Sequence, residues 1–412
     1  MNSVLGVIAE YNPFHAGHLY HISESKKLAK TDYVVVVMSG NFVQRGDTSL
    51  VDKWIKTEMA LNCGADLILE LPTIYSISSA ENFAEGAIKL LDSLGIIDVF
   101  SFGNEHCDIS VLDDIANVLY KEPKEYSTIL ARELQKGLSF PKARENALML
   151  YLNDIRRYAS VLSSPNNILG VEYLKALKRI KSFMQPLAIN RYGASYNSTS
   201  LNNGFASATA IRELVKKRDF TEVAKAMPKS SFNLLKDCIF KGKYVTDIYK
   251  FEKEILYKFR TMSTQEINNL PDVNEGLDVV LKKAANSCNT LKEFFNIAKT
   301  RRFTQTRLQR VCLYALLDIT KKDMLIAKKN SPYVRVLGFN KKGKELVSEI
   351  HRLNTKLPIV TSVKKFMDSN SNKIAKSMLE IDIKSTNIYT LGYECDSWAN
   401  LDYTHKLVIA DD

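Results

Sequence analysis

Five short apolar runs, separated by helical patterns, constrain the fold of the first 220 residues most strongly. The runs are SVLGVIAEY (3–11), DYVVVVMSG (32–40), ADLILELP (65–72), IDVFSFGNE (97–105) and the weaker QPLAINRYG (185–193). Runs that stay apolar without alternating are typical of strands buried on both faces, as in a parallel sheet. Strands that alternate with helices form βαβ units with right-handed crossovers. The sequence therefore predicts the α/β class, with a Rossmann-like, doubly wound parallel sheet.

The clearest helical pattern between these runs is SSAENFAEGAIKLLDSLG (78–95). Its apolar residues recur at helical spacing and lie on one face, and Gly95 is a plausible stop. The residues of that face are Ala80, Phe83, Ala84, Ala87, Ile88, Leu91 and Leu94.

The sequence pattern changes twice after the predicted sheet. Residues 221–330 are helical in pattern and rich in lysine and arginine, and residues 331–412 mix helices with short strands such as YVRVLGF (333–339). We therefore expect three parts: an α/β domain at 1–220, a basic helical domain at 221–330 and a small mixed α/β region at 331–412.

Composition excludes several classes of protein. The 412 residues are 45% hydrophobic and 25% charged, as in an ordinary soluble globular protein, and no membrane span or signal peptide is expected. The six cysteines are scattered without metal-ligand spacing, which favours reduced thiols in the cytoplasm and no metal site. The net charge of +11 suits a polyanionic partner.

Two histidines stand directly after the first apolar run, in AEYNPFHAGHLYH (9–21). His15 and His18 would lie at the carboxyl end of a strand and the start of a helix, where free N–H groups and the helix dipole favour an anion. Three residues apart, they can point at one phosphate, and Gly17 would let a ligand approach the backbone. The alternative is that they cap the helix or bind a structural metal, and His21 is expected to be only a surface neighbour.

A second phosphate-binding candidate is FASATAIRELV (205–215). Ser207 and Thr209 can cap a helix whose N–H groups face phosphates, and Arg212 adds a cation. The alternative is an ordinary capped helix with a surface arginine.

Both stretches resemble motifs of one superfamily. FHAGH resembles the HxGH signature of the nucleotidyltransferases, which transfer a nucleotide from ATP with release of pyrophosphate, and FASATAIRELV resembles their (I/F)-S-(S/A)-T-x-I-R motif. More narrowly, the chain resembles the bacterial tRNA(Met) cytidine acetate ligase family. The stretches that carry this resemblance are EYNPFHAGHLYH, VVVMSGNFVQRGDTSLVDKWIKTEMAL, GADLILELP, FSFGNE, SSPNNILGVEYL and KTRRFTQTRLQR.

The resemblance implies a two-step reaction. Acetate is activated with ATP, normally accompanied by Mg²⁺, to give acetyl-adenylate and pyrophosphate, without acetyl-coenzyme A. The acetyl group then passes to N4 of the wobble cytidine of elongator tRNA(Met). We weigh two alternatives: a metabolite adenylyltransferase, which would leave the long segment beyond Arg212 unexplained, and a non-catalytic RNA-binding protein.

The resemblance also implies a set of site residues, with His15 and His18 as the catalytic pair. The expected ATP-binding residues are Val7, Ile8, Ala9, Glu10, Tyr11, Asn12, Pro13, Phe14, His15, Ala16, Gly17, His18, Leu19, Tyr20, Gly103, Asn166, Arg191, Ser207, Thr209 and Arg212. Asn166 could instead cap a helix, with Asn167 reaching the ligand, and Arg191 could be solvated. For acetate, SGNFVQRGD (39–47) is a candidate wall and Arg45 a candidate cation.

The stretch KTRRFTQTRLQR (299–310) is the candidate tRNA contact, because it combines cations, no acid and one aromatic residue. The cations are Lys299, Arg301, Arg302, Arg307 and Arg310. The alternative is a solvated helix face. A second basic turn lies at 332–346.

Overall fold

All five apolar runs form parallel strands of one sheet. The structure is a computed structural model that describes residues 3–105, 108–138, 140–190, 206–330, 333–353, 357–369 and 372–411. The strands stand side by side in the order β5-β2-β1-β6-β7, which confirms the doubly wound prediction. Their bounds are β1 Val4–Ala9, β2 Tyr33–Ser39, β5 Leu67–Leu71, β6 Val99–Asn104 and β7 Gln185–Asn190.

Strand β2 shows why these runs do not alternate. Val35 and Val37 point into one hydrophobic core, whereas Val34, Val36 and Met38 point into a second core on the opposite face. Helices α4 (Ala80–Ser93) and α9 (Pro165–Ile180) cover the first face, and α1 (Ala16–Ala29), α2 (Lys53–Leu61) and α10 (Ala208–Lys216) cover the other. Both faces of the sheet are therefore buried.

Helix α4 occupies the span predicted for it. Ser79 caps its start, because the Ser79 side chain accepts a hydrogen bond from the backbone N–H of Asn82. The helix ends at Ser93, and Gly95 follows with a φ of 67°, in the left-handed region that glycine adopts easily.

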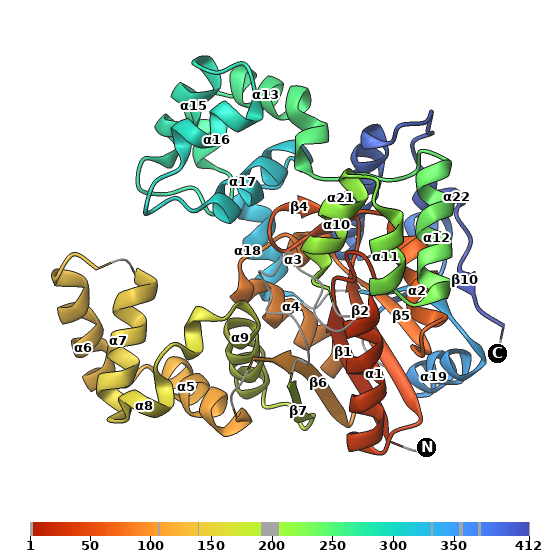
Figure 1. The fold of residues 1–412 in the computed structure, drawn as a ribbon, viewed down its shortest axis with the longest axis horizontal. Coiled ribbons are helices and arrows are strands. Elements are labelled where there is room, and N and C mark those ends of the chain that lie inside the picture. The colour runs from red at the N-terminus through yellow and green to blue at the C-terminus, as the bar shows by residue number, and fades with distance from the viewer. Residues whose placement is uncertain are drawn as a thin grey trace.

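A group of helices between β6 and α9 was not predicted. It stands beyond the sheet at the lower left of Figure 1. Its members are α5 Ile109–Lys121, α6 Lys124–Gln135, α7 Phe140–Leu152 and α8 Ile155–Tyr158, followed by the short turn η1 Val161–Ser163.

Residues 221–330 are helical wherever a regular element is assigned, as the pattern predicts. The elements are α11 Phe220–Ala226, α12 Lys229–Phe240, η2 Ile248–Phe251, α13 Glu252–Thr261, α14 Thr264–Asn268, α15 Leu277–Asn286, α16 Leu291–Ala298, α17 Gln305–Leu317 and α18 Lys321–Lys329. Helices α13, α15 and α16 gather at the upper left of Figure 1, whereas α12 packs beside α2 at the sheet. The boundary at residue 220 thus remains a prediction.

The C-terminal region is mixed α/β and extends the main sheet. Strand β8 (Val334–Phe339) pairs antiparallel with β5, and β9 (Ile359–Val360) and β10 (Val408–Ile409) pair with β8. The remaining elements are α19 Lys341–Arg352, α20 Val363–Ser369, α21 Lys373–Tyr389, η3 Thr390–Gly392 and α22 Leu401–Thr404. The boundary at residue 330 also stays a prediction, since residues 331–412 extend the sheet of residues 1–220 instead of forming a sheet of their own.

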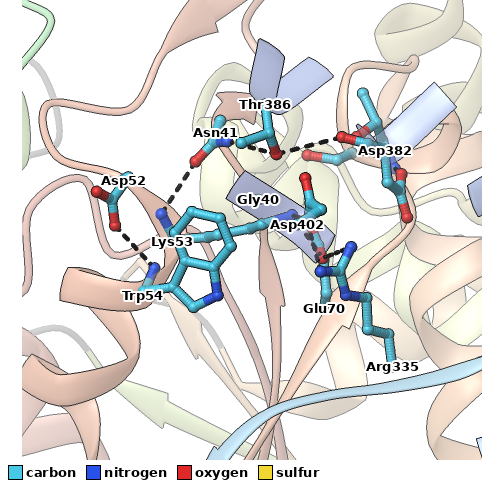
Figure 2. A network of polar contacts seen from close by, with 12 residues as sticks. Gly40, Asn41, Asp52, Lys53, Trp54, Glu70, Arg335, Asp382, Thr386 and Asp402 are labelled. Carbon is cyan, nitrogen blue, oxygen red and sulfur yellow. Dashed lines mark hydrogen bonds and ion pairs between the residues drawn. The ribbon is translucent and has the colours of Figure 1, made fainter. Parts of the chain in front are cut away.

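A buried ionic network joins this region to the sheet (Figure 2). The ammonium group of Lys53 on α2 lies 2.9 Å from Glu70 on β5 and 2.7 Å from Asp402 on α22. Arg335 on β8 pairs with the same two carboxylates, at 3.1 Å from Glu70. Two cations and two anions therefore balance one another inside the protein.

Two very short strands, β3 (Phe42–Val43) and β4 (Asp47–Thr48), pair antiparallel after β2. We call residues 40–50 the ribbon segment. Asn41 attaches it to α2 and to the C-terminal region, accepting a hydrogen bond from the backbone N–H of Lys53 and donating one to the Thr386 hydroxyl (Figure 2). The short helix α3 (Thr73–Ser76) packs against the ribbon segment, and the Ser76 hydroxyl donates a hydrogen bond to the carbonyl of Phe42.

Candidate active site

A cavity of about 240 Å³ opens at the carboxyl ends of β1, β6 and β7. The strand order reverses between β1 and β6, which is where doubly wound sheets bind their ligands. Its wall is formed by the end of β1 with the start of α1, the ribbon segment, the ends of β6 and β7, helices α4 and α9, and the start of α10.

The rings of His15 and His18 are stacked at the start of α1. Their ring centroids are 3.7 Å apart, with an angle of 22° between the planes. His15 is the N-cap residue, and its Nδ1 accepts a hydrogen bond from the backbone N–H of Gly17 at 3.0 Å. In return, Nδ1 of His18 accepts from the backbone N–H of His15 at 3.2 Å.

These two bonds fix the tautomer of each neutral ring. Because Nδ1 accepts a hydrogen bond in both cases, the proton of the neutral ring lies on Nε2, which makes each Nε2–H a donor. The histidines cap the helix, as the structural alternative predicted, and also line the cavity. Capping thus orients the rings.

Gly17 lines the cavity, and its missing side chain has a second role besides the expected approach of a ligand. A Cβ at this position would lie 2.9 Å from Cε1 and 3.1 Å from Nδ1 of the His15 ring. The missing side chain therefore leaves room for the capping histidine. His21 was expected at the surface, but it lines the cavity and its Nε2 contacts the Ser101 hydroxyl at 3.1 Å.

Helix α10 presents its first turn to the cavity. Ser207 is its N-cap and accepts from the backbone N–H of Ala210, while Thr209 lies within the first turn. Arg212 donates to the carbonyl of Asn12 at 2.9 Å, so it links α10 to the loop that carries the histidines. All three predicted residues of this motif line the cavity.

The structure separates the two neighbouring asparagines. Asn166 lines the cavity, and its amide donates to the Glu105 carboxylate at 2.6 Å. Asn167 is 2% exposed and bonds the backbone of Glu105 and of Val161. Neither caps α9, because the N-cap is Ser164. Asn166 is therefore the member of the pair that a ligand would meet.

Most of the other expected ATP-binding residues share this wall. They are Val7, Ile8, Ala9, Glu10, Tyr11, Asn12, Tyr20 and Gly103. Pro13, Phe14, Ala16 and Leu19 belong to the same loop and helix but are not among the lining residues, and Phe14 is fully buried in the core. Arg191 falls outside the described residues.

Sequence reasoning placed too little weight on the ribbon segment. Val43, Arg45 and Asp47 line the cavity, so the candidate acetate wall does adjoin the expected ATP site. One oxygen of Asp47 accepts from the backbone N–H groups of Thr48 and Ile248. Burial raises the pKa of Asp47, and the nearby charge of Arg212 opposes this effect. The position of this segment directly after β2, at the carboxyl edge of the sheet, was the available signal.

An apolar part of the wall was also missed. It comprises Phe83, Phe102, Leu169, Tyr173, Ile189 and Ala206. Nothing in the sequence marks which apolar residues lie at the sheet edge.

The basic stretch 299–310 divides into two groups. Lys299, Arg301 and Arg302 are exposed and precede α17. Arg307 instead donates to the carbonyl of Asp272 and lies over the Phe303 ring, and Arg310 pairs with the Asp272 carboxylate at 2.9 Å. Two of the five predicted tRNA contacts are thus engaged within their own domain.

Neither a membrane-spanning helix nor a cluster of metal ligands occurs among the described residues. No helix there has both the length and the apolar character to cross a bilayer. Likewise, no group of three or more histidine, cysteine, aspartate or glutamate side chains in those ranges is arranged to hold a metal ion.

Comparisons with known proteins agree with this geometry. Residues 1–402 match the family model HIGH Nucleotidyl Transferase. The tRNA(Met) cytidine acetate ligase of Caldanaerobacter subterraneus subsp. tengcongensis is 45% identical over 406 residues, covering 98% of this chain and 99% of the relative. The ligase of the same name from Acetivibrio thermocellus is 41% identical over 414 residues, with the same coverage.

Solved structures give the same result. The crystal structure of apo Thermotoga maritima TmcAL superposes with a TM-score of 0.94 at 34% identity, covering 100% of both chains. The same protein bound with alpha-thio ATP gives a TM-score of 0.92. The chain therefore belongs to the HIGH nucleotidyl transferase family and, within it, to the tRNA(Met) cytidine acetate ligases.

Proposed function

We propose that the protein activates acetate with ATP and transfers the acetyl group to N4 of the wobble cytidine of elongator tRNA(Met). The observation that carries the proposal is the stacked histidine pair, with both Nε2–H donors fixed at a helix start beside the cavity. The identity of the substrates is inferred from the family to which the chain belongs.

The first step is attack of an acetate oxygen on the α-phosphorus of ATP. A bond forms between that oxygen and the α-phosphorus. The bond between the α-phosphorus and the oxygen that bridges it to the β-phosphate breaks, and pyrophosphate leaves. The Nε2–H groups of His15 and His18 donate to the α-phosphate, where negative charge develops. Ser207, Thr209 and Arg212 face the departing phosphates at the start of α10.

Magnesium fits this arrangement as a companion of the triphosphate. Mg²⁺ needs one or two protein carboxylates when phosphates supply other ligands, and it keeps several waters. Glu10 and Asp47 both line the cavity and would hold it, and the ion would neutralise charge on the phosphates. No acetyl-coenzyme A is required, because the anhydride is already an activated acyl donor.

The second step is attack of the cytidine amine on the acetyl carbon. The new C–N bond replaces the bond to AMP, which leaves, and the amine loses one proton. This step depends on proximity and on exclusion of water more than on a strong base. The cytosine must leave its stack to reach the cavity.

We assign the tRNA contact to the exposed cations Lys299, Arg301 and Arg302. In this scheme residues 1–220 carry adenylation, 221–330 hold the tRNA, and 331–412 complete the sheet. A tRNA substrate also places the protein in the cytoplasm.

The test is incubation with ATP, labelled acetate and bulk tRNA, followed by mass spectrometry of digested nucleosides. We expect labelled N4-acetylcytidine, and acetate-dependent exchange of pyrophosphate into ATP without tRNA. Turnover only with a small metabolite in place of acetate would instead indicate an adenylyltransferase. tRNA binding without any nucleotide turnover would indicate an RNA-binding protein.

A further inference from the structure

Lys56 is a fully buried lysine beside the cavity with no part in the proposed chemistry. It belongs to α2 and has a relative exposure of 0%. Burial lowers its pKa to about 7, although the charges of Glu10, Glu70 and Asp52 oppose this. A lysine so placed is retained only where its ammonium group has good partners.

Its partners are four uncharged oxygens gathered from three segments. The ammonium group donates to the carbonyls of Glu10 at 2.9 Å, Ser39 at 2.7 Å and Gly40 at 2.8 Å. The hydroxyl of Ser49 is the fourth, at 2.9 Å. Glu10 follows β1, Ser39 ends β2, and Gly40 and Ser49 lie at or next to the two ends of the ribbon segment.

The same segments are bound to each other around the cavity. The Glu10 carboxylate accepts from the backbone N–H of Gln44 at 2.8 Å, at the tip of the ribbon segment. Asn12, three residues before His15, donates to the carbonyl of Thr48 and accepts from the N–H of Leu50. Lys56 thus joins the end of β1 to the ribbon segment, and other residues of both segments line the cavity.

We propose that Lys56 is a positioning residue for adenylation, holding the end of β1 and the ribbon segment at the separation that the reacting acetate and α-phosphate need. The inference rests on the proposed function. Lys56 acts through Glu10 and through Arg45 and Asp47 of the ribbon segment, which face the cavity.

Lys53 offers a matched control on the same helix. It is equally buried, but its ammonium group pairs with the carboxylates of Glu70 and Asp402, which belong to the network of Figure 2 and do not line the cavity. Loss of Lys53 should lower stability. Loss of Lys56 should change catalysis as well.

The experiment measures acetate-dependent ATP–pyrophosphate exchange in Lys56→Gln and Lys53→Gln, below their melting temperatures. For Lys56→Gln we expect kcat to fall about 100-fold, since a displacement of about 1 Å costs that much, while KM for ATP changes little. Ethylammonium should restore part of the kcat of Lys56→Ala and none of that of Lys53→Ala.

A kcat for folded Lys56→Gln within about threefold of wild type would overturn the proposal. So would equal kcat losses in the two glutamine variants. If Lys56→Gln does not fold, Lys56→Arg keeps the charge but moves the donors, and wild-type kcat in that variant would also overturn it. Absence of exchange in the wild type would instead refute the proposed function.

Discussion

Backbone N–H groups set the proton positions on His15 and His18. Each Nδ1 accepts from an N–H in the first turn of α1, so helix formation itself aligns both Nε2–H donors. The pair is also packed, since the His18 ring lies 4.8 Å from that of Tyr11. The orientation of both rings is therefore a property of the helix start.

Replacing His18 by alanine should therefore remove one preorganised donor without disturbing the core. We expect acetate-dependent exchange to fall about 100- to 1000-fold, with the loss of stability of about 0.5–2 kcal/mol that follows from losing a helix cap. His351→Ala, at an exposed position on α19, is the control for the same chemical change. Near-normal exchange in folded His18→Ala would exclude the pair from catalysis.

The neighbouring asparagines should respond in opposite ways. Asn166→Ala removes a donor at the cavity, and we expect KM for ATP to rise about 5- to 10-fold at unchanged stability. Asn167→Ala leaves the N–H of Glu105 without its partner, and urea unfolding should show a loss of about 1–3 kcal/mol. The reverse pattern would assign the ligand contact to Asn167.

Among the helices, α17 combines a core role with a candidate RNA contact. Its body is buried, with Leu308, Val311 and Leu313 inaccessible, while the residues before its first turn are exposed. Gly46 of the ribbon segment packs against its backbone, where a Cβ would lie 2.4 Å from the nitrogen of Arg310. The helix therefore adjoins the cavity wall at one end of its basic segment.

Replacing Lys299, Arg301 and Arg302 together by alanine should weaken tRNA binding and flatten its salt dependence. Each lost phosphate contact should remove about 0.7–0.9 from the slope of log K against log salt. Exchange without tRNA should be unchanged. The control removes three exposed lysines, Lys364, Lys365 and Lys373, from α20 and α21. Equal slopes in the two triple variants would move the RNA contact elsewhere.

At the scale of the molecule, the first and last parts of the chain share one sheet and one ionic network. Burial alone would raise the pKa of Asp402, but Arg335 and Lys53 outweigh it and lower that pKa. Asp402 therefore stabilises the fold above its unfolded pKa of about 3.9, and this contribution is lost as the pH falls below that value.

Asp402→Asn leaves Lys53 and Arg335 with one carboxylate, Glu70, between them. Breaking a buried ion pair typically costs about 3–5 kcal/mol, and urea unfolding at pH 7 should show a loss of that order. The difference from wild type should shrink below about pH 4, because the unfolded wild-type chain then takes up a proton at Asp402 that the folded protein does not bind until the pH is lower still. A constant difference across this range would contradict the ionic assignment.

The parallel strands and α4 were predictable because their signals are local: continuous apolar runs, and one apolar face with a glycine stop. The histidine pair was predictable for the same reason. Strands β3 and β4 are too short to show a period, and β8 reaches the sheet by a contact distant in sequence. Arg302 is exposed, whereas Arg307 bonds the backbone of Asp272. This difference depends on the folded structure and cannot be predicted from a run of basic residues.

The place of β8 in the sheet bears on how a ribosome makes this protein. Domains generally begin to fold from the N-terminus during synthesis, yet the partner of β5 is encoded in the last quarter of the message. Until it emerges, one edge of β5 presents unpaired N–H and C=O groups, which invite pairing with another nascent chain. Translation that stops before codon 334 would leave that edge open permanently, although every described segment of the cavity wall had already been synthesised.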